Sequence, residues 1–214
     1  NGIIPGFSQS GGLGLLAAQW MIEGEPEWDM FAWDLARFGD WADKAFTKAR
    51  VRDQYMHRFK IHFPNEERAA GRPAMMRPAY EMQRGIGAVF GLNAGWEHPL
   101  WFADAPGTED TNGFARQNWF EPVGREAAML REAVGVIDIS NFGKYEVTGP
   151  GAGDWLDVLV ANHVPREIGK SCLTPLIGTR GGVAGDFTIT MTGDESYMMI
   201  GSGMAERYHR RFFD

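Results

Sequence analysis

The sequence predicts a mixed α+β protein in which small sheets are covered by helices. One helix is indicated by apolar residues that recur at i, i+4, i+7 and i+11, at Val123, Ala127, Leu130 and Val134. Strands are indicated by alternation at residues 144–148 and by a hairpin of residues 187–191 and 197–200 around Thr192-Gly193-Asp194. Both periodicities occur along the same chain, which is the basis for the mixed class.

The first half of the chain is predicted to join short helices by connectors. A glycine-rich turn leads into a short helix that Gly24 ends, and residues 29–38 and 41–58 are expected to be helical. Residues 64–87 form a charged, loop-rich connector, and alternation from 87 to 102 indicates strands.

The second half begins with a polar loop at residues 103–118. The helix that follows starts near Pro122, where a missing N–H costs nothing, and Gly135 is placed to end it. A buried strand is expected at residues 136–139. The remaining predicted elements are a helix at 154–160, a strand at 173–177 and a helix from His209 to the end of the chain.

Composition narrows the classes of function. With 214 residues, of which 44% are hydrophobic and 23% charged, the chain can bury a core as one or two globular domains. A net charge of −7 argues against nucleic-acid binding, which needs a basic face. No apolar run approaches 18 residues, so no membrane-spanning segment is expected.

Cysteine and histidine usage predicts no metal site. Cys172 is the single cysteine, which excludes an intrachain disulfide and a multi-cysteine zinc site. The five histidines show no H-x-x-x-H or H-x-H spacing.

The run Gly12-Leu-Gly-Leu-Leu-Ala17 matches the pattern G-x-G-x-x-A of dinucleotide-binding folds. No apolar strand precedes it and no second strand follows to complete a strand–helix–strand unit. The run therefore indicates a glycine-rich helix start rather than a first dinucleotide turn.

A series of linked motifs resembles the aminomethyltransferase family, the T-protein of glycine cleavage. The series is an aromatic stretch, GWEHPLWF, then RQNWFEPVGRE, then RE-x-VG-x-x-D-x-S, then a strand that contains V-T-G-P. The aromatic stretch is similar, more narrowly, to dimethylglycine and sarcosine dehydrogenases. In that family a flavin-dependent amine oxidase is fused to a folate-binding T-protein-like domain.

The resemblance implies three parts and two cofactors. Residues 1–38 would be the end of an FAD-binding domain, 39–94 a central linking domain, and 95–214 the N-terminal part of a folate-binding domain. The chain would be an internal piece of a longer protein that uses FAD and tetrahydrofolate to demethylate dimethylglycine or sarcosine. Its partners would be a small methylated amine and folate. The protein would be located in the cytoplasm or, in a eukaryote, in the mitochondrial matrix. The alternative is a folate-binding module or subunit without oxidase activity.

For the flavin, the resemblance implies contact through a late glycine-rich turn. Such a turn aims a helix N-terminus at the pyrimidine edge of the flavin, where N–H groups stabilise the negative charge of the reduced ring. The residues at this position are Ser10, Gly11, Gly12, Leu13 and Gly14.

For the one-carbon chemistry, the resemblance singles out Asp186. It lies in GGVAGDFTI, which is similar to the family stretch GGV-x-DD, with Gly185 in place of the first acid. In the family this carboxylate lies beside the folate nitrogens and can accept a hydrogen bond or a proton. Composition alone would favour a turn aspartate at the start of a strand.

Five more residues fall at positions that line the folate site in the family pattern: Phe142, Leu173, Thr188, Ile200 and Ser202. Leu173 stands where the family often has Tyr, and Phe142 stands where it commonly has Met. Outside this set, Asn162 and His163 are read as a cap at the end of a helix and His98 as a structural histidine. No Ser/His/Asp or Cys/His nucleophile arrangement is indicated.

Overall fold

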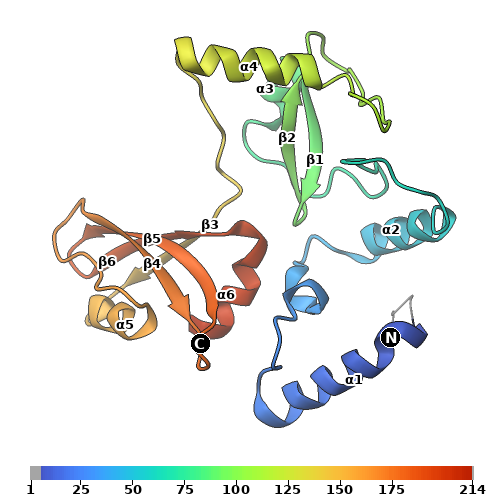
Figure 1. Cartoon of the computed structure of the whole chain (residues 1–214). Coiled ribbons are helices and arrows are strands. Elements are labelled where there is room, and N and C mark those ends of the chain that lie inside the picture. Colours follow the sequence, from blue (N-terminus) through green and yellow to red (C-terminus); the bar gives the residue numbers. More distant parts are fainter. Residues whose placement is uncertain (1–5, 214) are drawn as a thin grey trace. The chain divides into compact units, whose positions relative to one another are not determined.

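The computed structural model describes residues 6–213 (Figure 1). Residues 1–5 and Asp214 lie outside the described part. The chain divides into two compact units, residues 1–37 and residues 38–214.

The first unit consists of α1 (Gly6–Glu23) and two short 3₁₀ helices, η1 (Phe31–Trp33) and η2 (Leu35–Arg37). The expected glycine-rich turn at Ser10–Gly14 is wrong, because these residues lie inside α1. Glycine weakens a helix by about 1 kcal/mol relative to alanine but does not prevent helical backbone angles. The leucines and alanines that follow are strong helix formers, so the helix extends through the glycines.

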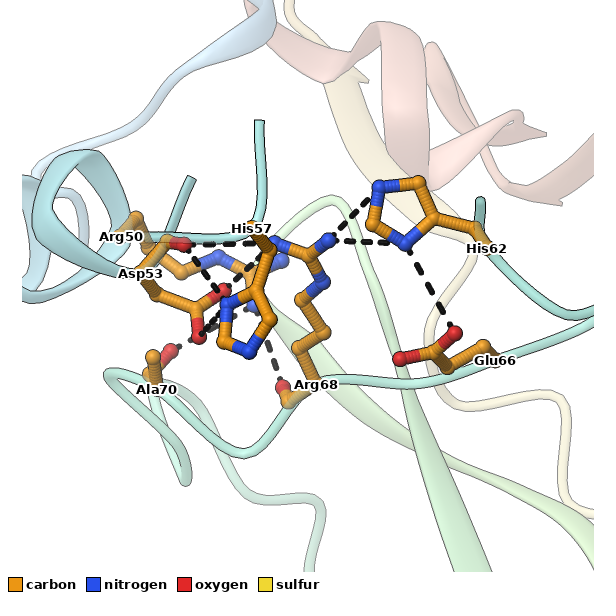
Figure 2. Close-up of polar contacts among 7 residues, drawn as sticks. All are labelled: Arg50, Asp53, His57, His62, Glu66, Arg68 and Ala70. Atoms are coloured by element: carbon orange, nitrogen blue, oxygen red, sulfur yellow. Dashed lines mark hydrogen bonds and ion pairs between the residues drawn. The ribbon is translucent and has the colours of Figure 1, made fainter. Parts of the chain in front are cut away.

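In the second unit, α2 (Lys44–Met56) confirms the helix predicted from composition. It begins at Asp43, whose carboxylate accepts a hydrogen bond from the Phe46 N–H (2.7 Å). Its far end is joined to the connector by Arg68, as Figure 2 shows. The Arg68 guanidinium donates to Asp53 Oδ2 (2.9 Å) and to the His62 imidazole (2.7 Å to Nε2).

After α3 (Tyr80–Gly85), the predicted strand region is a two-stranded hairpin of β1 (Ala88–Asn93) and β2 (Trp96–Phe102). Ala94 and Gly95 form its turn and both have positive φ, 48° and 88°, which is the signature of a type I′ turn. The predicted domain boundary between residues 94 and 95 falls inside this turn. The domain boundaries themselves remain predictions.

Two arginines hold this hairpin, and of these Arg77 is buried and Arg72 is partly buried. Arg72 makes a two-pronged contact with the buried Glu97, from Nε to Oε1 (3.1 Å) and from Nη2 to Oε2 (2.6 Å). Arg77 donates from Nε to the Glu97 carbonyl (3.1 Å) and from Nη1 to the Asp138 carbonyl (3.0 Å). Arg77 therefore connects the hairpin to the segment that leads into the larger sheet.

The predicted helix is confirmed as α4 (Phe120–Glu132), but its surroundings differ from the prediction. It ends at Glu132, before Gly135. Residues 136–139 do not form the expected buried strand, and Val136 and Ile137 are exposed. An apolar run becomes a strand only where a free sheet edge is available, and here Asp138 instead accepts a hydrogen bond from the Ser140 N–H in a local turn.

The larger sheet has the strand order β3-β6-β5-β4 and is antiparallel throughout. Its strands are β3 (Gly143–Thr148), β4 (Ser171–Ile177), β5 (Val183–Gly193) and β6 (Ser196–Gly201). The hairpin predicted from residues 187–191 and 197–200 is thereby confirmed, although residues 192 and 193 belong to β5 and the turn lies at 194–195.

One face of this sheet is covered by α5 (Ala152–Leu159) and α6 (Glu206–Phe213), which follows the short 3₁₀ helix η3 (Gly203–Ala205) (Figure 1). The core on that face is buried, and five of its side chains are at most 1% exposed: Leu156, Leu176, Phe187, Ile189 and Met199. Because side chains alternate along a strand, the intervening residues point to the opposite, open face.

Candidate functional site

A cavity of about 320 Å³ lies over the open face of the larger sheet. Its lining contains all six residues to which the sequence assigned a folate contact: Phe142, Leu173, Asp186, Thr188, Ile200 and Ser202. Their roles toward folate remain proposals, but their convergence on one cavity is a property of the fold.

Strand register brings these residues together. Leu173 of β4 is opposite Thr188 of β5, and Thr188 is opposite Ile200 of β6, so the three form one row across the sheet. Asp186 precedes Thr188 by two residues and therefore points to the same face. Residues 142 and 202 flank the paired residues Gly143 and Gly201, which brings both loops to the same end of the sheet.

Two glycines allow the loops around the cavity to pack closely. A Cβ at Gly203 would overlap the carbonyl oxygen of Asn141, another residue of the cavity wall. A Cβ at Gly201 would lie 2.6 Å from the Phe187 ring. Side chains at these positions would displace the loop that carries Phe142 or the core beneath the cavity.

Asp186 is exposed to this cavity, and none of the described residues donates a hydrogen bond to its carboxylate. Beneath it, on the buried face, lies His209 of α6, whose Nδ1 is 3.0 Å from the Tyr145 hydroxyl. Burial lowers the pKa of His209, and the negative charge of Asp186 opposes that shift. The imidazole is therefore held toward its neutral form.

His209 also explains why Gly185 stands where the family pattern has an acid. A Cβ at Gly185 would lie 2.7 Å from His209 Nε2, which is too close for any side chain without movement. Nε2 is buried and has no hydrogen-bond partner among the described residues.

Six further residues line the cavity and were not predicted from the sequence: Asn93, Trp96, Asn141, Gly201, Gly203 and Met204. Asn93 and Trp96 come from the β1–β2 hairpin, about 90 positions before Asp186 in the sequence. The aromatic stretch that begins at residue 95 and the turn that precedes it were the only signals available. Neither signal indicates which distant residues the hairpin meets.

The residues assigned to the flavin are not part of this cavity, since Ser10–Gly14 lie in the other compact unit. In a helix that begins at Gly6, their N–H groups bond to carbonyls four residues earlier. They therefore do not offer free N–H groups to a flavin, and a flavin contact by these residues remains a prediction.

The other residues considered from sequence have structural roles. Asn162 donates from Nδ2 to the Leu173 carbonyl (3.0 Å), which fastens the loop after α5 to β4. His163 is almost fully exposed, beside Asp157. His98 is half-buried next to Arg77, and burial, followed by the charge of Arg77, lowers its pKa.

Two further findings concern the described residues only. No group of three or more His, Cys, Asp or Glu side chains among them is arranged to hold a metal ion. None of their helices combines the length and the apolar character needed to cross a membrane.

Comparison with known proteins settles the family. The family model "GCVT N-terminal domain" matches residues 79–213, which is more than half of the chain. The chain belongs to this family. A second family model, "FAD dependent oxidoreductase central domain", matches residues 23–76. The resemblance inferred from the linked motifs and the α+β class are both confirmed.

Individual relatives agree with this membership. The chain is 33% identical over 211 residues to mouse mitochondrial dimethylglycine dehydrogenase, covering 98% of the chain and 24% of the relative. It is 28% identical over 242 residues to human mitochondrial sarcosine dehydrogenase, covering 94% of the chain and 26% of the relative. The chain thus spans about a quarter of the length of the curated relatives it matches.

A solved structure shows the same fold. The crystal structure of the glycine cleavage system aminomethyltransferase T from Bartonella henselae matches with a TM-score of 0.50 and 23% identity. The match covers 65% of this chain and 34% of that structure.

Proposed function

We propose that this GCVT-family chain is part of an FAD-dependent oxidoreductase that oxidatively demethylates an N-methylated glycine, dimethylglycine or sarcosine, and passes the one-carbon unit to tetrahydrofolate. The observation that supports transfer to tetrahydrofolate is the cavity that Asp186 lines together with the other residues predicted to contact folate. The oxidative half rests on the match to the FAD oxidoreductase central domain and on the relatives.

The cavity is chemically suited to the pteridine end of a reduced folate. Its walls combine aromatic rings, side-chain amides, hydroxyls and one carboxylate. Apolar and aromatic walls bind the faces of a flat ring, while a few polar groups fix its orientation through edge N–H and amino groups. A volume of about 320 Å³ admits one end of the carrier rather than the whole molecule.

Asp186 is the proposed catalytic group. As the one-carbon unit forms its bond to a folate nitrogen, that nitrogen must lose a proton, which the Asp186 carboxylate would accept. The bond between the one-carbon unit and the amine breaks, and the demethylated amine leaves after taking up a proton. The fully buried residues beneath β5 fix the strand that presents Asp186. Because no side chain among the described residues donates to the carboxylate, its oxygens are available to the ligand.

The test is Asp186→Asn in the purified enzyme, with Asp194→Asn in the exposed β5–β6 turn as the matched control. General-base assistance is worth about 10²–10⁴-fold, so formation of methylenetetrahydrofolate should fall by this order while flavin reduction changes little. Free formaldehyde should accumulate instead. If Asp186→Asn forms methylenetetrahydrofolate at the parent rate, the carboxylate has no role in the transfer.

A second candidate is a folate-binding module or subunit without oxidase activity. The observation that favours it is the position of Ser10–Gly14 inside α1, where their N–H groups are already bonded. The two candidates differ in the absorbance of the purified protein. Flavin bands at a stoichiometric level support the oxidoreductase, and their absence together with folate binding supports the module.

The relatives support a proposal for the compartment. Both dehydrogenases are named as mitochondrial proteins. We therefore place the protein in the mitochondrial matrix if its source is eukaryotic and in the cytoplasm otherwise. Organelle fractionation followed by immunodetection tests this assignment.

A further inference from the structure

We propose that Trp96, at the tip of the β1–β2 hairpin, is the stacking platform of the cavity and selects for a flat heteroaromatic ring. The proposal rests on the proposed function, because it concerns the same cavity. It assigns a specificity-determining role to a residue outside the set that the resemblance identified, and to a part of the chain other than the larger sheet.

The first observation is the composition of the walls. The sheet and its loops contribute Asp186, Thr188 and Phe142, whereas Asn93 and Trp96 come from the hairpin. Trp96 is only half-buried, so part of its indole remains available to a ligand. A cavity with an aromatic residue from each of two separate elements suits a planar ring, since ring faces stack favourably on aromatic side chains.

The second observation is that the backbone on both sides of Trp96 is fixed. The Met75 N–H donates to the Gly95 carbonyl (2.8 Å), and the Glu97 N–H donates to the Met75 carbonyl (2.8 Å). The Trp41 ring lies so close to Gly95 that a Cβ there would overlap it. A ring whose backbone is held in place before binding loses little freedom when a ligand stacks on it.

The third observation is the turn itself. Ala94 and Gly95 have the positive φ angles of a type I′ turn, so only two residues separate the paired strands. The turn joins Asn93 and Trp96, which are paired directly across the hairpin. An indole and an amide therefore enter the cavity side by side, one suited to the face of a ring and the other to its edge.

The direct test is calorimetric titration with 5-formyltetrahydrofolate, a stable reduced folate. The variants are Trp96→Ala and Trp96→Phe, and the matched control is Trp155→Ala, which removes an indole from the separate hollow beside β3. Stacking on an aromatic residue corresponds to roughly 5- to 150-fold in the dissociation constant. Trp96→Ala should weaken binding by this factor, Trp96→Phe should restore most of it, and Trp155→Ala should bind as the parent does.

A second measurement does not depend on the variants binding or folding well. The parent is labelled with 5-fluorotryptophan, and the ¹⁹F resonance of Trp96 is assigned by its loss in Trp96→Phe. Saturation with 5-formyltetrahydrofolate should shift this resonance and leave that of Trp155 unchanged. An unshifted Trp96 resonance at saturation would overturn the proposal even if Trp96→Ala is poorly folded.

The outcomes separate the two proposals. If the parent binds and Asp186→Asn weakens binding, but Trp96→Ala binds within twofold of the parent, the platform is refuted and the proposed function stands. If the parent does not bind 5-formyltetrahydrofolate at all, both fail. In a reduced folate only the pyrimidine ring of the pterin is flat and aromatic, so riboflavin, whose whole ring system is flat, serves as a competitor. Tighter binding of riboflavin than of 5-formyltetrahydrofolate would contradict the proposed folate function and leave the stacking platform standing.

Discussion

The two sheets of residues 38–214 are held by different forces. The β1–β2 hairpin depends on buried charges, with Arg72 and Arg77 bonded to Glu97. The four-stranded sheet depends on an apolar core in which Phe187, Met199 and their neighbours are fully buried. A two-stranded hairpin has too little apolar area to be stable alone, so directional ionic contacts take over that role. Directional contacts also fix the register of the two strands. A strand pair that forms part of a cavity wall needs a fixed register.

The largest expected effect on stability comes from removing the ionic contact that holds the β1–β2 hairpin. Glu97→Ala leaves the partly buried Arg72 guanidinium with only the more distant Glu67 carboxylate (3.9 Å), and breaking a pair whose carboxylate is buried costs about 3–5 kcal/mol of unfolding free energy. Urea unfolding measures this loss. Glu81→Ala, which removes the exposed Glu81–Arg84 pair, is the control and should cost about 0.5 kcal/mol or less. Equal effects of the two substitutions would contradict an ionic anchor at the hairpin.

Leu156→Ala tests the contribution of the apolar core beneath the four-stranded sheet. Leu156 of α5 is fully buried against the larger sheet, so its truncation should cost about 2–5 kcal/mol through lost burial and a residual cavity. Urea unfolding measures this loss. Val158→Ala, on the exposed side of the same helix, is the control and should change the unfolding free energy by no more than about 0.5 kcal/mol.

A smaller effect is expected where the loops meet over the cavity. Gly203→Ala introduces a Cβ against the Asn141 carbonyl, so the loop must move. Overpacking typically costs about 1–3 kcal/mol. Binding of 5-formyltetrahydrofolate should weaken together with stability, because Asn141 and Phe142 line the cavity. Gly182→Ala, where a Cβ meets no atom within 4 Å, should leave both measurements near the parent values.

The smallest expected effect is a pH dependence of the larger sheet. Burial lowers the pKa of His209 below its ordinary value of 6.5, with Asp186 opposing, while the groups around it are Tyr145 and the exposed Glu206. As the pH falls, His209 is therefore protonated in the unfolded chain at a higher pH than in the folded protein. The free energy of unfolding decreases as the pH drops from about 6.5 toward the lower pKa of the folded state. Urea unfolding between pH 8 and pH 5 measures this slope.

His209→Gln provides the control for that slope, because glutamine does not titrate. The difference in unfolding free energy between parent and variant should be constant above pH 7 and should shrink as the pH falls. A difference that grows toward low pH would mean that the protonated form of His209 is the favoured one in the folded protein.

Much of the fold follows from local sequence pattern. The alternation in β5 and β6 and the apolar spacing in α4 were sufficient to predict these elements, because backbone geometry dictates the periods of 2 and 3.6 residues. The same alternation places Asp186 and Thr188 on one face of the sheet. The linked motifs supplied the family, and with it the sheet side of the cavity.

Only the tertiary structure decided the rest. It left residues 136–139 outside any sheet and set His209 against Gly185. It also brought Trp96 to the cavity that contains Asp186. The periodicity of apolar residues predicts which residues share a face of a helix or strand. It does not predict which distant segment of the chain covers that face. That choice is made by the packing of whole elements and by the contacts of Arg72 and Arg77 with Glu97, which fix the strand that carries Trp96.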